Sequence, residues 1–110
     1  MSQVTTHVLD AVRGTPASGV SVTLSERGGE GWEPVASAVT DDDGRVSDFG
    51  PEHLENGVYQ VRFDTGMYFS QLDVETFYPE VVITFEVDGA EHYHVPLLLS
   101  PFAYSTYRGS

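Results

Sequence analysis

The stretch HYHVPLLLSPFAYSTYRGS, residues 92–110, decides the fold class. It holds two strand-like runs, 92–100 and 103–107, separated by a Ser-Pro pair that signals a turn. Successive side chains of a strand point to opposite faces. One face of each run is expected in the core: Val95, Leu97, Leu99, Tyr104 and Thr106. The opposite face of each run mixes polar and apolar groups: His94, Pro96, Leu98, Ser105 and Tyr107.

The rest of the chain repeats this pattern of short β-runs broken by turns. Strand-like runs occupy 5–12, 20–24, 35–40, 58–65 and 80–89. Turns or loops are expected at 13–19, 25–34 and 41–45, an irregular segment at 46–57, and one short helical turn at 66–73. Seven to eight short strands predict an all-β fold, a two-sheet antiparallel β-sandwich with one short helix. The 110 residues are expected to form a single domain, 1–110.

The first strand adds a second histidine to the face opposite the core. Alternation places His7, Leu9 and Ala11 on one side of this strand. An outer face that carries apolar side chains beside His7 and His94 is poorly suited to water. We therefore expect this face to be an interface or a binding channel.

Composition and charge exclude several classes of partner. The chain carries 17 acidic residues against five arginines and no lysine, a formal charge of −12 at pH 7. Repulsion from phosphate argues against nucleic acid and against an anionic membrane as partners. The absence of cysteine excludes disulfides and thiolate metal sites. No basic and apolar leader is recognisable and no apolar run approaches the ~20 residues of a membrane span, so we expect a cytoplasmic protein.

His7 and His94 are the candidate catalytic pair. Neutral imidazole accepts a proton near pH 7, so two imidazoles on one face suit the activation of water. The alternative is that they are solvated or interface histidines. His92 has the same parity as His94 but lies nearer a turn, where a solvated role is favoured. His53 lies in the irregular segment, and no role is expected for it.

The sequence contains two candidate metal sites. His7, His92 and His94 together offer the three imidazoles of a zinc site, but no carboxylate has an obvious supporting spacing. The acidic run at 41–44 resembles part of a calcium loop. Aligning Gly44 with the required glycine puts Val39 at the first ligand position and Gly50 where glutamate is needed. We expect no metal and no cofactor.

Arg45 and Ser110 are the remaining polar candidates. Arg45 follows the acidic turn, where it is either solvated or salt-bridged, or a fixed positive charge for an oxyanion or anionic substrate. Ser110 is a nucleophile, a hydrogen-bond donor or simply the last residue. No G-x-S-x-G elbow surrounds it, and a terminal serine also brings a carboxylate, which argues against an acylated nucleophile.

These residues resemble the transthyretin-like 5-hydroxyisourate hydrolase family over nearly the whole chain. The segments GVSVTL, TDDDGRV and GVYQVRF fit prealbumin-like sandwich modules in general. The specific part combines His7 in HVLD, Arg45 in DGR, His94 in HVPLLLSP and the terminal YRGS. Transthyretin, the hormone carrier, shares VLDAVRG, LSP and YST but lacks these histidines and this ending.

The resemblance implies a transthyretin (prealbumin)-like sandwich that assembles as a homotetramer, a dimer of dimers with its sites at the dimer–dimer channel. It implies hydrolysis of 5-hydroxyisourate, a small purine-derived molecule of urate degradation, to 2-oxo-4-hydroxy-4-carboxy-5-ureidoimidazoline without a metal. The implied catalytic residues are His7, Arg45, His94 and Ser110. The histidines would activate water, Arg45 would hold substrate and stabilise negative charge, and Ser110 would hydrogen-bond substrate or water.

The same resemblance implies substrate-binding roles for His7, Arg45, Tyr107, Arg108 and Gly109. Tyr107 would narrow the channel in favour of a small flat ligand. Arg108, Gly109 and Ser110 would close the pocket, with Gly109 allowing a bend beside the substrate. Which histidine is the general base stays open.

Two other functions are compatible with the fold. A transthyretin-type carrier would bind a small ligand in the same channel without catalysis, and the two histidines and YRGS argue against it. A structural prealbumin-like module would be a monomer within a longer secreted chain, and the YRGS ending argues against that.

Overall fold

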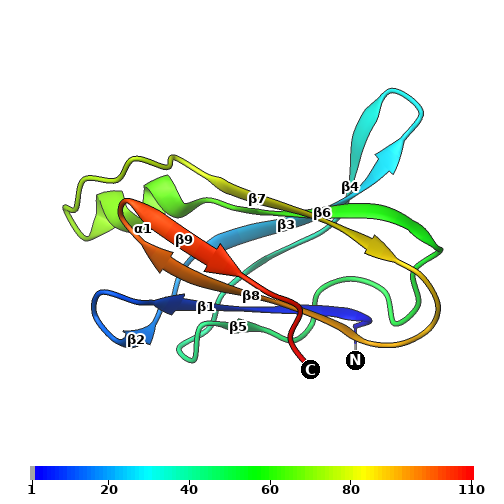
Figure 1. Cartoon of the computed structure of the whole chain (residues 1–110), viewed down its shortest axis with the longest axis horizontal. Coiled ribbons are helices and arrows are strands. Elements are labelled where there is room, and N and C mark those ends of the chain that lie inside the picture. The colour runs from blue at the N-terminus through cyan, green and yellow to red at the C-terminus, as the bar shows by residue number, and fades with distance from the viewer. Residues whose placement is uncertain (1) are drawn as a thin grey trace.

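The computed structural model describes residues 2–110 and contains two β-sheets with one short helix at one end of them (Figure 1). The five-stranded sheet contains β1 (Val4–Asp10), β2 (Thr15–Pro16), β5 (Arg45–Val46), β8 (Tyr93–Ser100) and β9 (Ala103–Thr106). The four-stranded sheet runs β4–β3–β6–β7, formed by β3 (Ser21–Gly28), β4 (Gly31–Val39), β6 (Gly57–Phe63) and β7 (Val81–Val87). Helix α1 (Thr65–Gln71) follows β6.

The predicted two-sheet sandwich with one short helix is confirmed. The structure adds the two-residue strands β2 and β5, which makes nine strands in place of the expected seven or eight. Strand β1 pairs in parallel with β8, whereas the other strand pairings are antiparallel. In this parallel register Thr5 lies opposite His94, and His7 lies opposite Pro96.

Alternation along β1 and β8 separates the core from the outer face as expected. Val8, Leu97 and Leu99 are at most 1% exposed and belong to a core cluster that includes Leu24 and Phe63 of the other sheet. On the outer face of the same two strands Thr5 and Pro96 are buried, and four residues are half-buried: His7, Leu9, His94 and Leu98. The sequence pattern therefore assigned the faces of both strands correctly.

The prediction of core positions was wrong for β9. Tyr104 is 41% exposed and Thr106 is also exposed, because β9 is the edge strand of its sheet and has no neighbour beyond it. The Tyr104 ring instead packs edge-on against Tyr78, with ring centroids 5.2 Å apart. Alternation gives the face of a strand, but only its position in the sheet decides how well that face is covered.

The loop predicted at 25–34 is also different in the structure. Strands β3 and β4 continue their pairing through this segment to Gly28 and Gly31, and the hairpin stands away from the two sheets (Figure 1). Gly31 has φ of 150°, a backbone conformation that favours glycine in a tight hairpin. The Arg27 guanidinium lies 5.3 Å from the centroid of the Trp32 ring across the strands. Pro34 is accommodated because β4 is an edge strand.

Helix α1 confirms the helical turn predicted at 66–73. The Asp64 side chain caps it by accepting a hydrogen bond from the Met67 backbone N–H. Its inward residues Tyr68 and Phe69 are buried, and the Tyr68 hydroxyl donates to Asp10 Oδ2 at 2.8 Å. This bond ties the helix to the end of β1. Within residues 2–110, no helix has the length and apolarity needed to cross a membrane.

Candidate active site

Two neighbouring strands bring the predicted histidine pair together. His7 of β1 and His94 of β8 lie on the same outer face, with ring centroids 6.5 Å apart and ring planes inclined by 28°. Both side chains are half-buried. The parallel pairing of β1 with β8 is the cause, because it aligns two strands whose histidine-bearing faces match.

The acidic turn places Arg45 beside His7 of β1. Asp41 Oδ1 accepts hydrogen bonds from the backbone N–H groups of Asp43 and Arg45, and β5 then pairs Arg45 with His7. Gly44 has φ of 73°, and a Cβ at this position would collide with the backbone oxygen of Val8. The turn predicted at 41–45 is therefore confirmed, and its glycine is required by both conformation and close approach.

The C-terminal tail reaches the site by lying against His94. The Gly109 backbone N–H donates to the His94 carbonyl at 2.9 Å, forming an isolated bridge beyond β9. A Cβ on Gly109 would lie 2.6 Å from His94 Cδ2. Gly109 does not have a positive φ. The structure thus gives close approach to the imidazole as the reason for a glycine at this position.

A cavity of about 310 Å³ collects several of the predicted residues. His94, Arg45 and Ser110 line it. The other lining residues come from β1, from β5 and the residue after it, and from the segment before β8: Thr5, Thr6, Val46, Ser47 and His92. His7 lies beside it, in a smaller hollow of about 100 Å³ that Tyr107 and Leu98 also line. An imidazole, a guanidinium and the chain terminus thus surround one space large enough for a small planar molecule.

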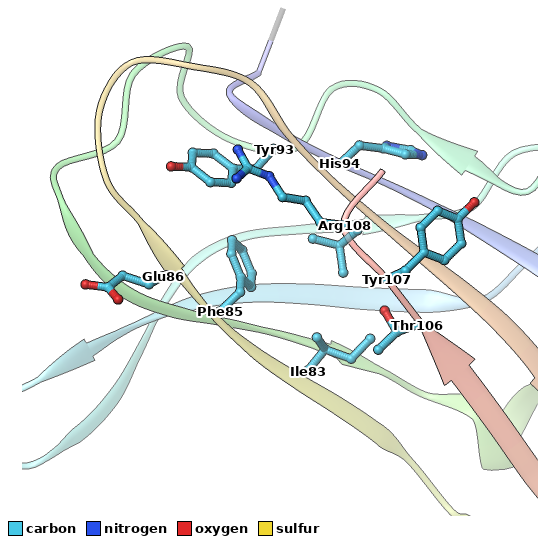
Figure 2. Close-up of a pocket in the computed structure, with 9 residues that line it drawn as sticks. Ile83, Phe85, Glu86, Tyr93, His94, Thr106, Tyr107 and Arg108 are labelled. Atoms are coloured by element: carbon cyan, nitrogen blue, oxygen red, sulfur yellow. The ribbon is translucent and has the colours of Figure 1, made fainter. Parts of the chain in front are cut away.

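Arg108 does not line the cavity of Arg45 and Ser110. Its guanidinium lies over the Tyr93 ring (Figure 2), 4.6 Å from the centroid. It also pairs with Glu91 at 3.2 Å. It lines a separate cavity of about 310 Å³ between the edge strands of the two sheets, together with Phe85 and Tyr107. Arg108 therefore contacts Tyr93 at the start of β8, and the next residue, Gly109, bridges to His94 of the same strand.

Burial and positive charge keep both histidines neutral. Burial is the largest cause that lowers the pKa of His7 below 6.5, and the Arg45 guanidinium adds to it, while groups of Asp41 and Asp43 oppose it. Burial also lowers the pKa of His94, with further contributions from His7, His92 and Arg45. A histidine with a lowered pKa is uncharged at neutral pH and can accept a proton.

Sequence reasoning missed Thr5 and underrated His92. The Thr5 Oγ1 lies 2.8 Å from His94 Nδ1 and 3.0 Å from His92 Nε2, so one hydroxyl joins both rings. His92 is exposed, as expected, yet its ring lies 6.4 Å from that of His94. Strand alternation could have indicated Thr5, because Thr5 lies two residues before His7 and therefore points to the same face of β1. Among residues 2–110, no three His, Cys, Asp or Glu side chains are arranged to hold a metal ion.

Comparison with known proteins places this chain among proteins of related sequence and shape. The HIUase/Transthyretin family matches residues 4–109. A protein of Caulobacter vibrioides named 5-hydroxyisourate hydrolase is 47% identical over 115 residues, which span all of both chains. The structure of Klebsiella pneumoniae 5-hydroxyisourate hydrolase superimposes with a TM-score of 0.89 at 39% identity, covering 100% of this chain and 94% of that one. Transthyretin from Sparus aurata superimposes with a TM-score of 0.93 at 34% identity, covering 99% and 97%.

Proposed function

Because this chain belongs to the HIUase/transthyretin family, we propose that it hydrolyses 5-hydroxyisourate. The observation that carries the proposal is the cavity lined by His94, Arg45 and Ser110, with His7 beside it. Fold alone does not separate hydrolase from carrier, since the TM-scores to the two kinds of protein are 0.89 and 0.93. Two neutral imidazoles next to a guanidinium are the chemistry that hydrolysis needs and passive binding does not.

In the proposed reaction, water attacks the carbonyl carbon of an amide-type C–N bond in the six-membered ring. An imidazole of the His7–His94 pair takes the proton from water as the new C–O bond forms. The C–N bond then breaks, and a proton returns to the leaving nitrogen. The ring-opened product is 2-oxo-4-hydroxy-4-carboxy-5-ureidoimidazoline, and no metal takes part.

Arg45 and Ser110 have supporting roles in this scheme. The Arg45 guanidinium binds the substrate and stabilises negative charge on the attacked carbonyl oxygen, which is typically worth about 10²–10³-fold in rate for one oxyanion donor. Ser110 hydrogen-bonds the substrate or the water. Tyr107, 60% exposed and beside the His7 hollow, limits the ligand to a small flat molecule.

The proposal includes assembly as a dimer of dimers. The outer face carries Leu9, Leu98 and Tyr107 beside His7, a mixed apolar surface that a second dimer would cover. The sites would then lie in the channel between the dimers. The expected cytoplasmic location is part of the same proposal and can be tested by cell fractionation.

The test follows 5-hydroxyisourate generated in situ from urate and urate oxidase, by ultraviolet absorbance with and without the protein. We expect decay well above the spontaneous rate, lost in His94→Ala and retained in His53→Ala, a matched control in an exposed loop. Decay no faster than buffer, from a folded tetramer, would instead favour the carrier.

A further inference from the structure

Thr5 is a buried polar residue next to the imidazole pair. Its side chain is 7% exposed, and its hydroxyl contacts His94 Nδ1 and His92 Nε2 at 2.8 and 3.0 Å. This contact follows from the register, because Thr5 is the partner of His94 in the parallel β1–β8 pairing. The mechanism described above gives Thr5 and His92 no task.

Proton counting links the two rings that Thr5 joins. A hydroxyl has one proton and donates one hydrogen bond, while a neutral imidazole has one N–H. When Thr5 donates to His92 Nε2, His94 must donate its Nδ1–H to Thr5, and His94 Nε2 is left as a proton acceptor. When Thr5 donates to His94 Nδ1, the proton of His94 sits on Nε2, and His92 donates its Nε2–H to Thr5. The first arrangement makes His94 a base at Nε2, and the second makes it an acid.

We propose that Thr5 is a positioning residue that, together with His92, sets which nitrogen of His94 carries the proton. This inference rests on the proposed function, because a fixed tautomer matters only if His94 transfers protons. Exchange from the first arrangement to the second moves one proton along each of the two hydrogen bonds, while His94 Nε2 takes up the proton from water and the exposed His92 releases its Nδ1 proton to solvent, so the charge of the three side chains is unchanged. The reverse transfer, in which His92 takes a proton back at Nδ1 and Thr5 returns one to His94 Nδ1, lets His94 give its Nε2 proton to the leaving nitrogen. This relay through Thr5 and His92 therefore lets His94 act first as base and then as acid in one turnover.

The charge on His92 biases the relay. Protonated His92 can only donate at Nε2, which forces Thr5 to donate to His94 and removes the basic lone pair from His94 Nε2. Other charged or titratable groups also face His94: His7 on β1 and Arg45 on β5, both of which lower its pKa. A pH profile therefore has to be compared between variants that change only the Thr5–His92 link.

The test uses Thr5→Val, which keeps the side-chain shape and removes the hydroxyl, and Thr5→Ser, which restores it. We expect kcat to fall about tenfold in Thr5→Val, the size of one lost hydrogen bond at its upper range, with KM nearly unchanged. Thr5→Ser should recover most of the rate. Thr106→Val is the matched control, because its hydroxyl donates to the Pro96 carbonyl on the same sheet rather than to an imidazole.

A spectroscopic measurement distinguishes a role of Thr5 in fixing the His94 tautomer from a general loss of structure in the variant. Side-chain ¹⁵N spectra of histidine-labelled protein distinguish Nδ1–H from Nε2–H, so they read the tautomer of His94 without substrate. Thr5→Val and His92→Ala should both change this tautomer and move the acid limb of the kcat profile, whereas Thr106→Val should change neither. His92→Ala keeps the test available if Thr5→Val does not fold.

The outcomes are distinguishable. An unchanged His94 tautomer and an unchanged kcat in Thr5→Val would overturn the proposal, as would an equal loss of rate in Thr5→Ser. If the wild-type protein does not accelerate decay of 5-hydroxyisourate, the proposed function fails, and the spectra still report whether Thr5 and His92 fix the tautomer. A tautomer that depends on Thr5 and His92, with a rate that follows it, supports the relay.

Discussion

Replacing Gly109 by alanine tests whether the tail must touch His94. The added Cβ would lie 2.6 Å from His94 Cδ2, whereas carbon atoms make contact at about 3.5 Å, so one partner must move by roughly 0.9 Å. His94 belongs to β8, which is paired on both sides, whereas Gly109 meets this strand through an isolated bridge. The tail should therefore move, and the bond from the Gly109 N–H to the His94 carbonyl should break.

The two consequences of this shift differ in size. Loss of one hydrogen bond at the chain end should lower the free energy of unfolding by no more than about 1.5 kcal/mol. Displacement of Ser110 and the imidazole by nearly 1 Å should lower kcat/KM about 100-fold, since misplacement of that order can cost two decades of rate. Activity should thus be lost from a protein that remains folded and assembled.

The assay combines the decay of 5-hydroxyisourate with thermal unfolding and gel filtration of the same samples. Gly29→Ala is the matched control, because a Cβ there meets no atom within 4 Å and the residue lies in the β3–β4 hairpin. We expect this control to keep wild-type activity. A Gly109→Ala protein with kcat/KM within about twofold of wild type would refute the reasoning, as that small change means the tail tolerates the displacement or never needed the contact.

Four further predictions follow from the same site. His7→Ala and His94→Ala should each lower kcat by about two decades or more while the tetramer persists; full activity in either variant would remove that residue from the mechanism. Because the pKa of both histidines is lowered, kcat/KM should hold its plateau below pH 6.5 before it falls. The unfolded chain binds these protons first, so the free energy of unfolding should also decrease as pH drops below about 6.5, and a titration by thermal melts that shows the opposite slope would contradict the shifts. Arg108→Gln removes a cation–π contact worth about 0.5–1 kcal/mol and an exposed ion pair; we expect a several-fold loss of kcat/KM and faster amide exchange at Gly109, and unaltered exchange would show that Arg108 does not fasten the tail. Leu98→Asp places a charge on the outer face and should convert tetramers to dimers in gel filtration, whereas an intact tetramer would argue that this face is not the interface.

Alternation along β1 and β8 was enough to predict the site face. It placed His7 and His94 outside and the aliphatic residues Leu97 and Leu99 inside, and the structure agrees on each. The acidic turn before Arg45 was equally readable, because its glycine and aspartates have strong local preferences. These features depend on residues close together in the sequence.

Features that depend on pairing between distant segments were not predictable in this way. The contact of Thr5 with His94 requires the parallel register of β1 and β8, which no local pattern specifies. The exposure of Tyr104 depends on β9 being an edge strand, and the close approach of Gly109 depends on where the tail lies. In each case the sequence shows the residue itself, but it does not show which distant segment the residue contacts.

The position of Trp32 has a practical consequence for measuring ligands. It is the single tryptophan of the chain, and it lies in the projecting β3–β4 hairpin under the Arg27 guanidinium, on the other sheet from the histidines. Intrinsic tryptophan emission will therefore report on the environment of the hairpin, and we expect it not to change when a ligand binds in the cavity. A flat fluorescence titration would be the expected optical behaviour of a working enzyme, and binding has to be followed by calorimetry or by the imidazole resonances.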